Sequence, residues 1–324
     1  MISAEDLLDV IEKEILDFLE SINDNLIYAP SSYLLSLGGK RIRPILLLMA
    51  HQMFNNNFKT SLPAALAIEL FHNFTLLHDD IMDESIIRRG QATVNKKWSN
   101  NIAILSGDIM LVHSYRLLNK LRSDYSKEIF EVFNTAALEV CEGQYMDMVF
   151  EDRNDVNIDE YIKMIQYKTA ALLSASLKIG AINAGANDKL SQNLYDFGKN
   201  IGIAFQLNDD FLDVFGNTEN FGKKIGGDIM MNKKTYLYLK SLELSNNKQK
   251  KDLLYYYSLP YNHPSIKEKI FEVKHIFKSL KIDEITKELI FNYNHQAISF
   301  LDKIPSDYKS ILQDFSQRLL NRSN

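Results

Sequence analysis

Hydrophobic residues recur at helical spacing along almost the whole chain. In residues 5–22, Leu7, Ile11, Ile15, Phe18 and Ile22 stand three or four positions apart between acidic residues, as on one face of a helix. A break follows near Asn23–Pro30. The same periodicity predicts helices at 45–53, from about 61 to 88–90, and at 101–121, 127–150, 158–184, 189–215, 235–244, 249–257, 265–280, 283–303 and 306–321. No stretch alternates like a strand over a convincing length, so the pattern predicts an all-α fold.

One interval departs from this pattern. Residues 216–234 mix Gly216, Gly222, Gly226 and Gly227 with lysines, which is typical of a mobile loop. Elsewhere the chain contains no low-complexity linker. We therefore expect a single domain over residues 1–324.

Composition supports a helical globular protein. Of 324 residues 46% are hydrophobic and 24% charged, while the 13 glycines and 6 prolines are few for this length. The formal net charge of −5 argues against nucleic-acid binding, which requires a basic face. An anionic substrate must then be held by local basic clusters or by metal ions.

Cellular location is also constrained. The single cysteine, Cys141, excludes an internal disulfide and fits a reducing compartment. No apolar run approaches the ~18 residues expected of a membrane helix, and the first residues show no signal peptide. We expect a cytoplasmic protein without a membrane span.

Two copies of an acidic pentapeptide carry the most specific chemistry. They are Asp79-Asp80-Ile81-Met82-Asp83 and Asp209-Asp210-Phe211-Leu212-Asp213. Residues four apart share a helix face, so the outer aspartates of each copy point together. These carboxylates repel one another unless a cation neutralises them. Mg²⁺ prefers oxygen ligands and usually completes its coordination with substrate phosphates.

A single motif of this type is most often a solvated acidic face. Here each copy follows an apolar segment directly, His72–His78 in the first case and Phe205–Asn208 in the second. Carboxylates attached to buried turns are less often fully solvated. The pair therefore favours a magnesium–phosphate site.

Two basic segments accompany the first acidic motif. Gly38-Gly39-Lys40-Arg41-Ile42-Arg43-Pro44 combines a flexible backbone with three cations, and Lys40 and Arg43 are close enough to reach one anion. Arg88-Arg89 follows Asp83 by about one and a half helical turns. Either segment taken alone could equally be a basic turn on the surface. Next to a metal site, however, the planar guanidinium groups of the arginines are suited to binding phosphate oxygens.

These motifs, in this order, resemble the trans-isoprenyl diphosphate synthases of the polyprenyl synthetase family. The resemblance spans nearly the whole chain. It also includes Gly90 after Arg88-Arg89, Gly143-Gln144, Lys168-Thr169, Phe205-Gln206 and Gly222-Lys223. It implies one large helical bundle of the isoprenoid synthase type around a central cavity, and a homodimer.

The resemblance implies a reaction in which isopentenyl diphosphate is added head to tail to an allylic diphosphate. Asp79, Asp83 and Asp209 would ligate Mg²⁺, three ions with substrate bound, supported by Asp80, Asp210 and Asp213. The expected allylic diphosphate contacts are Arg88, Lys168, Lys223 and, as a further contact, Lys233. The expected contacts of isopentenyl diphosphate are Lys40, Arg43, His72 and Arg89. Thr169 and Gln206 would face the developing carbocation.

His72 also fits on spacing alone, because it precedes Asp79 by two helical turns on the same face. The alternative is an ordinary core histidine, which we favour for His78.

Product length should depend on the residues below the first acidic motif. Thr75 lies one turn below Asp79, with Phe74 beside it and Phe71 a turn further down. The resemblance associates this pattern with geranylgeranyl-type enzymes, so we expect geranylgeranyl diphosphate first and farnesyl diphosphate second. The alternative is that both phenylalanines are ordinary core residues.

Two departures concern the loop after the second motif. Family members often have Glu-Gly where this chain has Met231-Asn232, and often proline in place of Lys224. These differences put the detail of loop closure in doubt.

Three other functions compete. A class I terpene cyclase also ionises diphosphates, but it leaves Lys40, Arg43 and Arg89 without a role. A non-catalytic partner subunit would not need six acidic ligands. A helical protein with calcium-binding acidic faces leaves the basic motifs unexplained.

Overall fold

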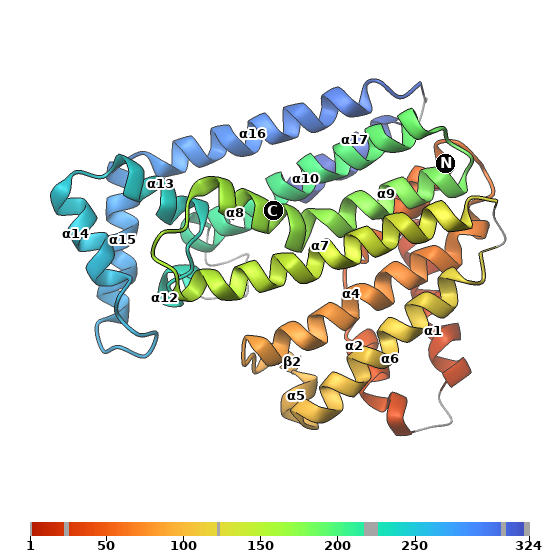
Figure 1. Ribbon diagram of the computed structural model, residues 1–324, viewed down its shortest axis with the longest axis horizontal. Helices are drawn as coiled ribbons and strands as arrows, with labels where there is room; N and C mark the ends of the chain where they lie inside the picture. The colour runs from red at the N-terminus through yellow and green to blue at the C-terminus, as the bar shows by residue number, and fades with distance from the viewer. Residues whose placement is uncertain (1, 23–25, 122–123, 217–225, 306–308, 321–324) are drawn as a thin grey trace. The chain divides into compact units, whose positions relative to one another are not determined.

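The computed structural model describes residues 2–22, 26–121, 124–216, 226–305 and 309–320. Most of these residues are helical and very few are in strands, which confirms the predicted all-α fold (Figure 1). The chain divides into two compact units. Unit 1 comprises residues 1–134, 175–194 and 306–309, and unit 2 comprises 135–174, 195–305 and 310–324. The expectation of one domain over residues 1–324 stays a prediction.

Unit 1 is built on α1 (Ala4–Ile22), α3 (Ile42–Gln52), α4 (Leu62–Met82) and α6 (Asn100–Leu118). Helices α4 and α6 lie side by side (Figure 1). Gly107 of α6 permits this approach, because a Cβ there would lie 2.5 Å from the His78 imidazole and 3.3 Å from Phe74. Shorter elements complete the unit: α2 (Ala29–Ser36), α5 (Val94–Lys97) and the 3₁₀ turns η1 (Leu26–Tyr28) and η2 (Phe58–Ser61).

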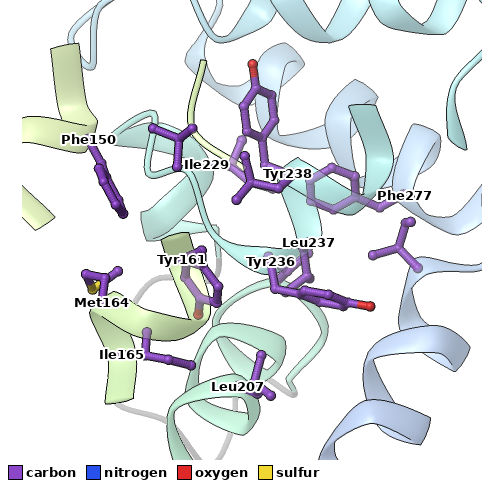
Figure 2. Close-up of a cluster of buried hydrophobic side chains, with 14 of the residues drawn as sticks. Phe150, Tyr161, Met164, Ile165, Leu207, Ile229, Tyr236, Leu237, Tyr238 and Phe277 are labelled. Carbon is purple, nitrogen blue, oxygen red and sulfur yellow. The ribbon is translucent and has the colours of Figure 1, made fainter. Parts of the chain in front are cut away.

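Unit 2 draws on α7 (Ser126–Asp152), α8 (Ile158–Ile165), α9 (Ala171–Asn183) and α10 (Asp188–Phe215), three of which also supply residues to unit 1. Its later helices are α12 (Gly227–Met230), α13 (Tyr236–Leu244), α14 (Asn247–Tyr256), α15 (Ile266–Ser279), α16 (Ile282–Leu301) and α17 (Lys309–Leu320). Figure 2 shows part of its core, where Tyr161, Ile165 and Leu207 approach Tyr236 and Leu237.

Most predicted helices are confirmed within a few residues, but several details were wrong, among them the short helices α5 and α12, which were not predicted. Helix α2 was not predicted; Pro30 stands in its first turn, where the missing N–H costs nothing. Helix α4 ends at Met82 rather than near 88–90. The predicted helix 158–184 is interrupted by a π turn, η3 (Gln166–Ala170).

A β hairpin replaces the predicted end of α4. Strands β1 (Ile87–Arg88) and β2 (Gln91–Ala92) pair antiparallel around the two-residue turn Arg89-Gly90. Both turn residues have positive φ, 51° and 75°, as the tightest hairpins require. Arg88 therefore reaches the acidic motif through this hairpin, and not along a continued helix as predicted.

Arg41 supports the basic segment from inside unit 1. Its fully buried guanidinium bonds Glu69 and Glu12, each at 2.8 Å, and the Leu35 carbonyl at 2.7 Å. Asn73 donates to the same Glu69 oxygen at 2.9 Å. Of the three cations between Lys40 and Arg43, the middle one is thus bound within the protein.

Replacing Glu69 with glutamine should lower the free energy of unfolding by about 3 kcal/mol, because Arg41 then keeps a buried charge without its buried counter-ion. Glu12→Gln is the matched control: its carboxylate is 37% exposed, so the loss should stay below about 1 kcal/mol. Urea denaturation measures both. Equal losses would contradict the assignment of Glu69 as the principal partner.

Candidate functional site

The first acidic motif forms the carboxyl end of α4. Asp80 is buried at 2% exposure and Asp79 is partly buried. Asp83 is exposed and follows the last helical residue. Its N–H still donates to the Asp79 carbonyl at 2.8 Å, so Asp83 continues the helical hydrogen bonding by one position.

Arg88 bridges two of these carboxylates. Its Nε donates to Asp80 Oδ2 at 2.7 Å and its Nη2 to Asp79 Oδ2 at 3.5 Å. The hairpin is tied to the helix end because Ser85 N–H donates to the Asp80 carbonyl at 2.9 Å and Thr93 donates to the Ser85 carbonyl at 2.8 Å. One guanidinium thus offsets part of the repulsion within the motif.

The carboxylates of this motif fit a hard divalent cation. Among the described residues, Asp80 Oδ1 is buried and accepts no hydrogen bond, which leaves one carboxylate oxygen available to a cation. Within the residues that the structure describes, no group of three histidine, cysteine or acidic side chains is close enough to hold a metal ion without other ligands. Mg²⁺ fits such a site if phosphate oxygens or water complete its coordination.

The glycine-rich segment lies against Arg89. Arg89 Nη1 donates to the Gly38 carbonyl, and a Cβ at Gly39 would lie 3.0 Å from the Arg89 guanidinium. Gly38 and Gly39 have φ of 72° and 153°, which side chains rarely tolerate. Glycine is therefore required here both for conformation and for the close approach of Arg89. Lys40, next in the chain, is exposed.

His72 lies within a group of guanidinium groups. Arg43 Nη1 is 3.1 Å from His72 Nε2. Burial, followed by the positive charges of Arg43, Arg89, Arg88 and Arg41, lowers the pKa of His72 well below its usual value. The structure thus brings together the basic residues that the sequence placed in two separate segments, and this cluster is suited to an anion.

The expected chain-length residues lie on α4. Phe71 is buried and contacts Phe74 at 5.4 Å and Phe133 at 5.3 Å between ring centroids. Phe74 packs on His78 at 4.7 Å. The Thr75 hydroxyl donates to the His72 carbonyl at 2.8 Å. Both rings have core contacts, and their role in product length stays a prediction.

In unit 2 the π turn η3 presents Lys168 and Thr169. Gly143 of α7 allows the turn to approach, because a Cβ there would collide with the Lys168 backbone. Lys168 Nζ forms an ion pair with Asp147 at 2.6 Å. A π turn inserts one extra residue into a helix and is frequent at functional sites.

A chain of polar side chains connects Thr169 to the second acidic motif. Thr169 donates to Gln206 Oε1 at 2.9 Å, and Gln206 Nε2 donates to Asp210 Oδ1 at 2.9 Å. The buried Tyr161 hydroxyl donates to the other Asp210 oxygen. Burial and the charge of Asp228 raise the pKa of Asp210 well above its usual value, although both hydrogen bonds act in the opposite direction.

The segment after the second motif folds back onto Asp213. Gly226 N–H donates to the Asp213 carbonyl at 2.7 Å, and Asp228 N–H donates to Asp213 Oδ2 at 2.9 Å. Lys233 Nζ lies 4.0 Å from Asp228 Oδ1. Lys223, predicted as a diphosphate contact, and Lys224 lie outside the described residues.

These side chains line one cavity of about 410 Å³ in unit 2. Its wall combines the acidic motif with the cations and polar groups described above: Asp147, Tyr161, Lys168, Thr169, Gln206, Asp209, Asp210, Asp213, Asp228, Lys233 and Lys234. The structure thus brings together every unit 2 residue predicted for the site except Lys223. That the two acidic motifs approach one another stays a prediction.

Four of the cavity residues named above, Asp147, Tyr161, Asp228 and Lys234, were not predicted from the sequence. Asp147 follows Gly143 by one helical turn, a spacing that could have been noticed. Tyr161 reads as a core aromatic, and Asp228 as one acid in a glycine-rich loop. Neither gave a usable signal.

The family model described as "Polyprenyl synthetase" matches residues 24–274. A geranylgeranyl diphosphate synthase from Sulfolobus acidocaldarius is 39% identical over 284 residues, 86% of this chain and 85% of the relative. A geranylfarnesyl diphosphate synthase from Natronomonas pharaonis is 32% identical, covering 92% and 90%. A crystal structure of a geranylgeranyl pyrophosphate synthase superposes with a TM-score of 0.91 at 43% identity, covering 98% and 99%.

The pKa of His72 should lie well below 6.5 in an NMR titration, because burial and the guanidinium groups disfavour its protonated form. Since its pKa is lower in the folded than in the unfolded protein, the stability that His72 contributes is present above pH 6.5 and is lost as the pH falls through the native pKa. Inorganic diphosphate should raise this pKa by offsetting the positive charges. No change with diphosphate would argue against an anion site.

Proposed function

Because this chain belongs to the polyprenyl synthetase family and is a prenyltransferase, we propose that it condenses isopentenyl diphosphate head to tail with allylic diphosphates. The product is a short all-trans prenyl diphosphate, geranylgeranyl diphosphate first and farnesyl diphosphate second. One observation carries this proposal: in unit 1, guanidinium groups surround His72, which stands on the same helix as an acidic motif. A condensing enzyme needs places for two diphosphates.

Asp79, Asp83 and Asp209 would hold Mg²⁺ for the allylic diphosphate, and Asp80, Asp210 and Asp213 would support it directly or through water. Bound Mg²⁺ supplies positive charge that stabilises the diphosphate as it leaves. Arg88, Lys168, Lys233 and Lys223 contact the same diphosphate. Arg88 and Lys168 are bonded to Asp80 and Asp147 in the structure, and anion binding would redirect these cations toward phosphate oxygens.

Isopentenyl diphosphate is held by Lys40, Arg43, His72 and Arg89. His72 serves as a neutral hydrogen-bonding partner, consistent with its lowered pKa. Arg89 is kept in place by its bond to the Gly38 carbonyl. This second anion site distinguishes the proposal from a class I terpene cyclase, which requires only one.

Breaking the allylic C–O bond leaves a carbocation that the protein must stabilise without attacking. Gln206 donates its N–H to Asp210 and accepts from Thr169, so its amide is fixed at both ends. A fixed amide oxygen beside the cation gives electrostatic stabilisation without reorganisation. The π bond of isopentenyl diphosphate then attacks the cation, and the released diphosphate takes the proton lost from the adduct.

The same proposal includes a homodimer in the cytoplasm. Exposed apolar side chains are concentrated on α6, namely Ile102, Ile104, Leu105, Val112 and Tyr115, and a second group on α7 contains Leu138, Tyr145 and Met148. Such groups commonly mark protein–protein interfaces. No helix in the described segments is both long and apolar enough to span a bilayer. Sedimentation equilibrium should give twice the chain mass of 37.4 kDa, and a monomer would contradict the dimer.

Asp79→Ala and Asp209→Ala should each reduce kcat by about 100-fold or more, because the leaving diphosphate loses its electrostatic stabilisation. Excess chelator should abolish turnover. Radiolabelled isopentenyl diphosphate with each allylic diphosphate measures both effects. The exposed Asp17→Ala serves as the matched control and should keep full activity. Product formation in excess chelator would contradict the metal-dependent reaction, and no prenyl product from the unaltered protein would favour a non-catalytic partner subunit.

Phe74→Ala should lengthen the products by one or more isoprene units, because it shortens the aromatic barrier below Asp79. Phe74→Leu is a milder variant if the cavity destabilises the fold. Phe277→Ala, which removes a buried aromatic from unit 2, controls for a general loss of packing. Chromatography of the dephosphorylated products gives their length. An unchanged product spectrum would reject the assignment of Phe74 as the floor.

A further inference from the structure

Lys269 of α15 is fully buried, and its partners are neutral. Its Nζ donates to the Met230 carbonyl at 3.3 Å, to the Leu259 carbonyl at 3.4 Å and to Asn232 Oδ1. The three N–H groups of an ammonium thus have three acceptors. The Tyr257 ring lies 5.6 Å away and adds a weaker attraction. Burial alone lowers the pKa of Lys269 to about 8.

Asn232 connects this lysine to the loop after the second acidic motif. Its φ of 60° is left-handed, a conformation that asparagine tolerates better than most residues with a side chain. Asparagine therefore fits this backbone conformation and also supplies a polar side chain. That side chain accepts from Lys269 and donates to the Leu259 carbonyl at 2.9 Å.

Helix α15 also supports the other end of the same turn. A Cβ on Gly226 would lie 2.7 Å from Ile270, so α12 begins in direct contact with α15. One residue earlier on α15, Lys269 holds the end of α12 at Met230 and Asn232. The short helix is therefore fixed at both ends by neighbouring residues of one helix.

Residues in and directly after α12 line the cavity. Its Asp228 N–H holds the Asp213 carboxylate at 2.9 Å, and Lys233 N–H donates to the Asp228 carbonyl at 2.9 Å. Asp213, Asp228 and Lys233 all line the 410 Å³ cavity. A displacement of α12 would thus move a carboxylate of the acidic motif together with a cation.

We propose that Lys269 and Asn232 form a buried latch, a pair of positioning residues that fixes α12 and so presents Asp213 and Lys233 to the allylic diphosphate. This inference rests on the proposed function for its substrate.

The test uses the full-length protein with Lys269→Met, Asn232→Gly and the double substitution. Methionine replaces the unbranched lysine side chain with one that is a single atom shorter and has no donors, and glycine keeps the left-handed backbone without the acceptor. Lys267→Met is the matched control, because it makes the same substitution at an exposed position of the same helix.

Amide hydrogen exchange is the first measurement, and it does not depend on activity. Residues 226–233 should exchange about 10-fold faster in both single variants, but not in Lys267→Met. Unchanged exchange would overturn the latch. If exchange accelerates in the variants but the unaltered protein makes no prenyl product, the proposed function is wrong. The conclusion that Lys269 and Asn232 fix α12 would still be supported.

Steady-state kinetics is the second measurement. The KM for the allylic diphosphate should rise about 10-fold in each single variant, whereas the KM for isopentenyl diphosphate should not change. In the double variant the melting temperature should recover relative to Asn232→Gly, because no stranded charge remains, but the raised KM should persist. Two outcomes would show that the pair has a purely structural role. One is faster exchange in the single variants with an unchanged KM for the allylic diphosphate. The other is recovery of this KM together with stability in the double variant.

Discussion

The candidate site depends on how the negative charges of the two aspartate motifs are compensated by neighbouring groups. In the first motif a single guanidinium, Arg88, pairs with Asp80 and reaches Asp79. In the second, the middle carboxylate is buried and bonded by Tyr161 and Gln206, with its pKa raised. The middle carboxylate is thus bonded by a cation in the first motif and by neutral donors in the second, so Asp80 and Asp210 lie in different electrostatic environments. Proposed magnesium sites at the two motifs need not have equal affinity.

Helical periodicity identified nearly all of the secondary structure. Each long helix buries one apolar face, and this produces a regular spacing of apolar residues that is visible within the helix's own sequence. The errors fall where a helix stops or is interrupted. The end of α4 depends on positive φ at Glu84, Arg89 and Gly90, and only the glycine signals this in sequence. The π turn η3 depends on Gly143 from a distant part of the chain, so no local pattern reveals it.

The candidate site was predictable where residue type restricts chemistry, and less so where packing decides. Aspartates and arginines at fixed spacing identified both acidic motifs and the basic cluster. The same reasoning selected Arg43, which contacts His72, but it gave no role to Arg41, which bonds buried Glu69. It also missed Tyr161, since a buried tyrosine is usually a core residue and becomes a hydrogen-bond donor to Asp210 only through the fold.

The π turn has a consequence for how this chain tolerates insertions and deletions. Each residue of an α-helix turns the next side chain by about 100°. The one added residue in Gln166–Ala170 therefore sets the angular phase between α8, which carries Tyr161, and the position from which Thr169 reaches Gln206. Deleting a residue there would leave the helix intact but out of phase, with Tyr161 and Thr169 no longer convergent. The number of residues in the π turn is thus as constrained as their identity, even though the turn itself is an irregular part of the helix.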